Sequence, residues 1–167
     1  MSLSSASQEI NHLMKILVAG NYQKKLGGAH SAMVSTAKLL SSHKHEVRIF
    51  SLDIDVDDYF YKKYGIFYKI VRFLLAPIFY IYNPLAGNRL HNLIKEFEPD
   101  CINIHLYIGG LSNSIIPTIR SNSIPSVHTI HDYRGICPAN AMLDNKGEIC
   151  ESCRGGLRSS LLKKCAG

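Results

Sequence analysis

The sequence predicts an α/β fold in which a parallel sheet is covered by helices on both faces. Short apolar runs with the composition of strands alternate with segments whose apolar residues recur at helical spacing, and this alternation is typical of such folds. Hydrophobic residues make up 46% of the 167 residues and charged residues only 19%, which is enough for a buried core and excludes a disordered chain. The length fits one domain, or one and a fragment.

The amino-terminal part of this sheet is predicted from a strand–loop–helix–strand unit. Residues 15–20 (KILVAG) form a short apolar run that ends in glycine, as suits a buried parallel strand. A polar loop over residues 21–28 ends in two glycines, and residues 29–42 then carry apolar side chains at helical spacing. Residues 45–53 return to a strand pattern, so the unit has roughly the length of a strand–helix–strand crossover.

The carboxyl-terminal part repeats this alternation. Residues 83–100 place apolar side chains on one helical face, and Pro99 ends that helix. Residues 101–107 have a strand pattern, residues 108–122 that of a loop and helix, and residues 124–132 that of a further strand. Because ligands of parallel sheets bind beyond the carboxyl ends of the strands, we expect the functional residues there.

Residues 53–58 (DIDVDD) form an acidic segment after the second predicted strand. Four carboxylates suggest a calcium loop, but neither a glycine nor a closing glutamate follows at the spacing that such a loop requires. We therefore expect a solvated turn.

The segment from Tyr59 to Tyr82 combines aromatic and basic residues. It holds 10 of the chain's 15 aromatic residues, and its uncharged part contains Pro77 and is well short of the roughly 20 residues of a membrane span. One interpretation is an amphipathic helix on an anionic membrane, with basic side chains at the headgroups and rings at the interface. The other is a core-packing helix that extends its lysines to solvent. The net charge of +6 favours anionic partners, although it also serves ordinary solubility.

Three segments are expected along the chain. Residues 1–13 lack the basic start and apolar core of a signal peptide, so they resemble a leader or an added extension, with Met14 as the expected native start. Residues 14–135 form the α/β domain, and residues 136–167 form a cysteine-containing loop and a truncated end. Without an export signal, the expected compartment is the reducing cytoplasm, where the five cysteines are thiols or metal ligands.

Two candidate binding features lie at predicted strand ends and loop ends. Gly27 and Gly28 precede the first helix, whose leading N–H groups can bind a phosphate or a hydroxyl, and glycine lets a ligand approach the backbone. Neither a dinucleotide-binding nor a P-loop glycine pattern is present, so the pair is also compatible with a simple turn. His105 ends a strand, where a histidine is either a packed core residue or part of a site.

His131 and Asp132 are the strongest candidates for chemistry. A histidine that titrates near neutrality beside a carboxylate can position a hydroxyl, move a proton or bind a sugar. His128 lies on the same strand and is expected to face the other side if the strand stays regular. The alternative is that Asp132 only caps the turn after the strand.

Four cysteines follow this pair, at Cys137, Cys150, Cys153 and Cys165. The two central ones have the C-x2-C spacing of zinc ligands, and four thiolates make a closed structural zinc site. This pattern suggests an alternative function, in which the chain is a zinc-binding module for an anionic partner such as nucleic acid. The remaining interpretation is free thiols on a loop, or a disulfide within the central pair.

In this order, the motifs resemble the amino-terminal half of a GT-B glycosyltransferase of family 4, of the glycosyl transferases group 1 type. MKILVAG matches the first strand, GGAH the opening of the first helix, and LSSHKHEVRIFS the family's "L...GHEV.V.". FEPDCINIHLY resembles "..PDVVH.H..", and IPSVHTIHDYRGICP resembles "IPVV.T.HD....CP". The match runs from about Met14 to Cys153.

The resemblance implies a Rossmann-like domain that holds the acceptor side of a cleft. In the family, a second such domain binds the nucleotide-sugar, most members retain the anomeric configuration, and the chemistry needs no bound metal. By position, Gly27, Gly28 and His105 are candidates to bind the donor phosphates or the acceptor. His131 would lie beside the transferring sugar, and Asp132 would orient the loop. His30 replaces a glutamate of many relatives and receives no role.

The expected function is therefore transfer of a sugar from a nucleotide-sugar to a glycan or a lipid-linked acceptor, as in polysaccharide biosynthesis. The segment from Tyr59 to Tyr82 would contact the inner face of the cell membrane, and no nucleic-acid partner is expected. The donor-binding domain does not follow in this chain, so we expect a truncated chain that is inactive alone.

Overall fold

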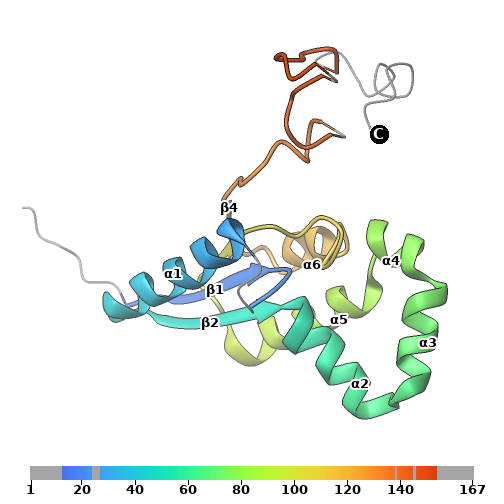
Figure 1. Cartoon of the computed structure of the whole chain (residues 1–167). Coiled ribbons are helices and arrows are strands. Elements are labelled where there is room, and N and C mark those ends of the chain that lie inside the picture. The colour runs from blue at the N-terminus through green and yellow to red at the C-terminus, as the bar shows by residue number, and fades with distance from the viewer. Residues whose placement is uncertain (1–12, 24–26, 138, 145, 154–167) are drawn as a thin grey trace, which may run out of the picture.

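The computed structural model describes residues 13–23, 27–137, 139–144 and 146–153. Its centre is a four-stranded parallel sheet with the order β2-β1-β3-β4 (Figure 1). The strands are β1 (Lys15–Gly20), β2 (Glu46–Ser51), β3 (Cys101–Ile104) and β4 (Ser126–His128). The predicted α/β class and the parallel sheet are confirmed.

Helices cover both faces of the sheet, as predicted. On one face, Ile16 and Val18 of β1 pack against Met33 and Ala37 of α1 (Gly28–Ser42). On the other face, the alternate β1 residues pack against α5 (Pro84–Phe97) and α6 (Ile115–Ser121) in a larger core cluster. This division follows from the period of two in a strand, which sends successive side chains to opposite faces.

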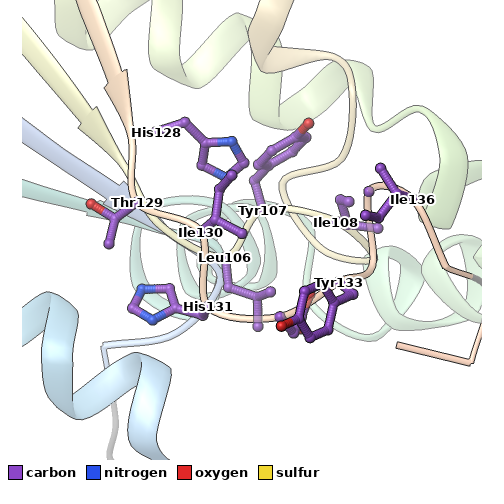
Figure 2. A pocket seen from close by; sticks show the side chains of 11 residues that line it. Leu106, Tyr107, Ile108, His128, Thr129, Ile130, His131, Tyr133 and Ile136 are labelled. Atoms are coloured by element: carbon purple, nitrogen blue, oxygen red, sulfur yellow. The ribbon is translucent and has the colours of Figure 1, made fainter. Parts of the chain in front are cut away.

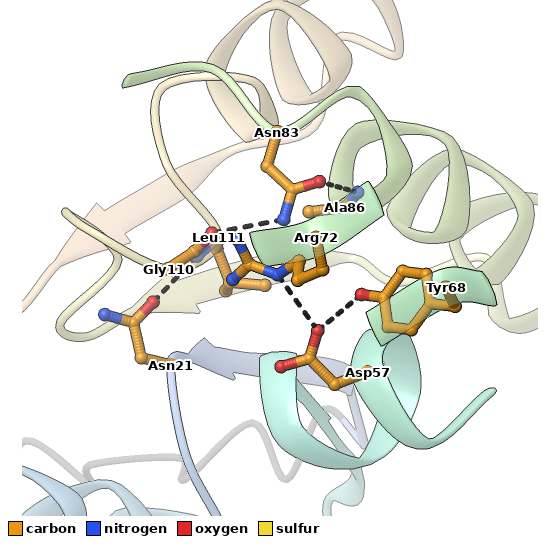
Figure 3. A network of polar contacts seen from close by, with 8 residues as sticks. All are labelled: Asn21, Asp57, Tyr68, Arg72, Asn83, Ala86, Gly110 and Leu111. Carbon is orange, nitrogen blue, oxygen red and sulfur yellow. Dashed lines mark hydrogen bonds and ion pairs between the residues drawn. The ribbon is translucent and has the colours of Figure 1, made fainter. Parts of the chain in front are cut away.

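Two buried asparagines fix the loops at the carboxyl edge of the sheet (Figure 3). The Asn21 side chain follows β1, accepts from the backbone N–H of Leu111 at 2.8 Å and donates to the carbonyl of Ile108 at 3.1 Å. Asn83 caps the start of α5 and donates to the carbonyl of Gly110 at 3.3 Å. A methyl group at Gly110 would collide with the Asn21 side chain, so this loop packs closely against the end of β1.

The acidic segment after β2 is not the solvated turn that we expected. It forms a wide helical turn, η1 (Leu52–Asp58), in which Leu52 and Val56 are fully buried. Asp55 folds back to accept from the backbone N–H of Ser51 at 2.7 Å, and burial raises the pKa of this carboxyl. Apolar residues alternate with the aspartates, and their burial turns one side of the segment inward.

The aromatic and basic segment forms three short helices instead of one. These are α2 (Tyr59–Tyr64), α3 (Ile66–Leu74) and α4 (Ala76–Ile81). Gly65 breaks the first junction with a φ of 59°, a conformation that glycine adopts readily. Together they form an arm beside the sheet domain, which we call the aromatic arm (Figure 1). No described helix is long and apolar enough to cross a membrane.

The aromatic arm is joined to η1 by a polar contact (Figure 3). Tyr68 of α3, which is 7% exposed, donates its hydroxyl to Asp57 at 2.6 Å, and Arg72 approaches the same carboxylate at 3.4 Å. Burial first, and then the hydrogen bond to Asp57, raise the pKa of the Tyr68 hydroxyl. Only Tyr68 and Phe79 of the arm are buried, so most of its apolar side chains face solvent.

Candidate functional site

A pocket of about 410 Å³ opens at the carboxyl ends of β3 and β4 (Figure 2). Its volume falls within the range of small-molecule sites. Three segments contribute its walls: Leu106, Tyr107 and Ile108 after β3, His128, Thr129 and Ile130 at the end of β4, and His131, Asp132, Tyr133, Gly135 and Ile136 beyond it. The site therefore lies where parallel sheets bind ligands, and the predicted pair His131 and Asp132 belongs to it.

His131 is hydrogen-bonded to His105 inside this edge of the sheet. His131 Nε2 lies 2.8 Å from His105 Nδ1, and the two rings stack with their centroids 5.0 Å apart. His105 is only 1% exposed. Burial, followed by the charges of His131 and His128, lowers its pKa to about 4. His105 is therefore neutral near pH 7, and it reaches the pocket through His131 instead of through its own surface.

His128 also lines the pocket, although strand alternation predicts that it faces away from His131. The strand ends at His128, so the alternation does not continue to residue 131. His128 instead stands beside Tyr107 with ring centroids 5.3 Å apart (Figure 2). Sequence reasoning missed Tyr107 and His128 as members of the site.

Asp132 turns toward Arg134. Its Oδ1 accepts from the backbone N–H of Arg134 at 2.9 Å, and its Oδ2 lies 3.5 Å from the guanidinium of that residue. These contacts close a turn directly after His131. The geometry fits the expectation that Asp132 orients the loop, and also the simpler interpretation that it caps the turn.

Gly27 and Gly28 begin α1 and do not line the pocket. Both are exposed, and a Cβ added to either would meet no atom of the described residues within 4 Å. Gly27 has a φ of 149°, which a residue with a side chain rarely adopts. Two residues after Gly28, the ring of His30 packs edge-on against Tyr22, and neither ring nitrogen has a hydrogen-bond partner within the described residues.

The cysteines do not gather into a metal site in the part of the chain that the structure describes. That part holds no group of three or more His, Cys, Asp or Glu side chains able to bind a metal ion. Cys137, Cys150 and Cys153 are partly buried, and Cys165 lies outside the described residues. The described segment after Ile136 extends away from the sheet (Figure 1). The zinc-module alternative therefore has no support from this geometry.

Residues 26–145 match the family described as Glycosyltransferase Family 4. The chain belongs to this family. The matched residues include α1, the strands β2, β3 and β4, and the residues that line the pocket. The match therefore identifies a glycosyltransferase domain with the Rossmann-like arrangement that the sequence motifs implied. No curated protein and no solved structure shows significant similarity to the chain.

Proposed function

We propose that this family 4 domain holds the acceptor during transfer of a sugar from a nucleotide-sugar to a glycan or a lipid-linked acceptor. The observation that carries the proposal is the pocket at the carboxyl ends of β3 and β4, with His131 in its wall. The transfer retains the anomeric configuration, as the family resemblance implies, and the nucleotide-sugar is a substrate. No catalytic metal is part of the proposal.

The lining of the pocket favours an acceptor with an apolar portion. Ile130, Tyr133 and Ile136 are 75%, 52% and 59% exposed at its mouth, and leucine and isoleucine side chains from the loop after β3 form the inner wall. A bare sugar offers little apolar surface, whereas a lipid-linked sugar covers such side chains and places its polar part beside the histidines. We therefore propose a lipid-linked acceptor in preference to a free glycan.

The aromatic arm supports a peripheral position at the inner face of the cell membrane. On α3, Phe73 is 80% exposed, while Ile66, Leu74 and Phe67 are each exposed by about two thirds (68%, 68% and 66%). An apolar surface of this kind marks an interaction site, and Lys62 and Lys63 beside it suit anionic headgroups. This exposure favours the membrane interpretation of the segment over the core-packing one.

The proposed acceptor pocket is tested by binding. The chain is titrated calorimetrically with a short-chain polyprenyl diphosphate sugar, a soluble stand-in for a lipid-linked acceptor. We expect binding to weaken by about tenfold in His131→Gln, the loss expected for one hydrogen bond to a charged or polar ligand group. His43→Gln changes an exposed histidine at the far end of α1 and is expected to bind like the original chain.

Two results would contradict the proposal. One is the absence of measurable binding of the polyprenyl diphosphate sugar to the folded chain. The other is equal binding by the original chain and His131→Gln, because the ligand would then occupy a different surface.

A further inference from the structure

The contact between His105 and His131 determines which nitrogen of His131 can meet a ligand. His131 Nε2 points inward to His105 Nδ1 at 2.8 Å. The remaining ring nitrogen, Nδ1, is therefore the atom that His131 can offer to a ligand. This inference deepens the proposed function and rests on it for the identity of the ligand.

The position of the proton follows from the burial of His105. A hydrogen bond between two neutral imidazole rings needs one N–H at the contact, and either ring can supply it. His105 Nε2 is buried and has no hydrogen-bond partner among the described residues. If His131 donated, the proton of His105 would have to reside on this Nε2, leaving a buried N–H without an acceptor.

If His105 donates from Nδ1, only a lone pair is left without a partner at its Nε2. Orphaned buried N–H groups are rarer in folded proteins than under-satisfied acceptors. His105 then remains neutral, and His131 must carry its own proton on Nδ1. The low pKa of His105, about 4, agrees with a ring that is not a cation at neutral pH.

We propose that His105 is a positioning residue, which donates from Nδ1 to His131 Nε2 and so makes His131 present Nδ1–H to an oxygen of the substrate. In this state His131 is a hydrogen-bond donor to a sugar hydroxyl or a phosphate oxygen. It is not a base toward that oxygen, because its lone pair is engaged by His105. Of the three roles that the sequence left open for His131, the proposal keeps positioning a hydroxyl and binding a sugar, and it excludes removing a proton from that oxygen.

The tautomer is measured directly on the ¹⁵N-labelled 167-residue chain. Long-range ¹H–¹⁵N correlation spectra at pH 7.5 distinguish protonated from unprotonated ring nitrogens, and the spectrum of His131→Gln assigns the His131 signals. We expect Nδ1 to be protonated with a preference of about tenfold or more, since the other tautomer leaves a buried N–H of His105 without an acceptor.

Three substitutions at residue 105 separate positioning from structural support. His105→Asn can place an amide N–H near the position of Nδ1 and is expected to keep the tautomer of His131. His105→Gln carries its amide further out, and His105→Leu has no donor, so in both the Nδ1 preference is expected to fall below about threefold. Circular dichroism shows which variants remain folded. If His105→Leu does not fold, His105→Gln takes its place as the variant without a donor at the position of Nδ1.

The proposal is overturned if His131 of the original chain is protonated on Nε2. It is also overturned if the His131 tautomer is the same in the Asn variant and in whichever of the Leu and Gln variants folds. The spectra need no substrate, so their result is separate from the acceptor-binding test. If His131 is protonated on Nδ1 but the chain does not bind the polyprenyl diphosphate sugar, only the proposed function is contradicted.

Discussion

His105 illustrates how burial changes the chemistry of a single residue. An exposed histidine gains its proton near pH 6.5, but the His105 ring is 1% exposed and already bonded to a second imidazole. Burial disfavours the cation, and its pKa falls to about 4. The folded chain thus binds this proton less readily than the unfolded chain does.

This difference predicts a pH-dependent stability. The low pKa of His105 stabilises the folded chain fully above pH 6.5. This stabilisation is lost as the pH falls from about 6.5 to about 4, because in this range the His105 ring takes up a proton in the unfolded chain but not in the folded chain. The loss in the free energy of unfolding is on the order of 3 kcal/mol, because each unit of difference in pKa corresponds to about 1.4 kcal/mol. The free energy of unfolding, measured in urea at pH 7.5, 5.5 and 4.5, is expected to decline accordingly.

The matched variant for this prediction is His105→Asn, which has no titrating group at this position. Its free energy of unfolding is expected to decline less over the same pH range. If the free energy of unfolding declines equally with pH in the original chain and in His105→Asn, groups other than His105 cause the decline.

At the scale of elements, Asn21 connects the end of β1 to the loop that follows β3. Its side chain is 3% exposed and is bonded to Ile108 and Leu111, which lie almost 90 residues further along the chain. Ile108 lines the pocket. The same amide group therefore supports both the packing of the loop and the shape of the candidate site.

Replacing this amide predicts a large loss of stability. Asn21→Ala leaves the buried N–H of Leu111 and the partly buried carbonyl of Ile108 without partners, at a cost of about 3 kcal/mol in the free energy of unfolding. Asn92→Ala removes an exposed amide from α5 and is expected to change stability by less than about 0.5 kcal/mol. Urea denaturation gives the free energy of unfolding of both variants. Similar losses in the two variants would refute the proposed contribution of the Asn21 side chain to stability.

At the scale of the whole molecule, polarity is unevenly distributed. The sheet domain has buried apolar clusters on both faces, whereas most apolar side chains of the aromatic arm are exposed beside basic side chains. Such an arrangement predicts association with anionic membranes through apolar insertion together with charge attraction.

Vesicle co-sedimentation tests this prediction. We expect the chain to bind vesicles that contain anionic phospholipid, and to bind neutral vesicles more weakly. Joint replacement of Lys62 and Lys63 by glutamine is expected to weaken binding by roughly thirtyfold, since each basic residue near the surface contributes about 1 kcal/mol. Joint replacement of Phe67 and Phe73 by serine is also expected to weaken binding, because it removes apolar side chains that would insert into the membrane. Added salt should reduce the effect of the lysine pair more than that of the phenylalanine pair.

Leu39→Ser is the matched control for the aromatic arm. Leu39 is 59% exposed but lies on α1, outside the arm. Its variant is expected to bind vesicles like the original chain. A membrane contact through the arm would be contradicted if the arm variants bound vesicles as strongly as the original chain. It would also be contradicted if Leu39→Ser lost as much binding as the arm variants.

Much of the fold could be predicted from the sequence because burial leaves a local periodic pattern. The apolar run of β1 and the helical spacing in α1 and α5 were each predicted within a few residues. The last strand was predicted over residues 124–132, with His131 at its end, whereas β4 already ends at His128. The acidic segment was predicted wrongly, because Leu52 and Val56 are too few to show a period of their own. The break at Gly65 was missed because the aromatic and basic composition is continuous across it.

The sequence by itself determined the parallel α/β fold, its glycosyltransferase family and the position of His131 at a strand end. Only the tertiary structure decided that His131 is paired with His105, that His128 shares the pocket and that the aromatic arm faces solvent. The physical reason is distance along the chain. Periodicity reports which side of an element is buried, whereas a contact across 26 residues depends on how two elements are placed against each other.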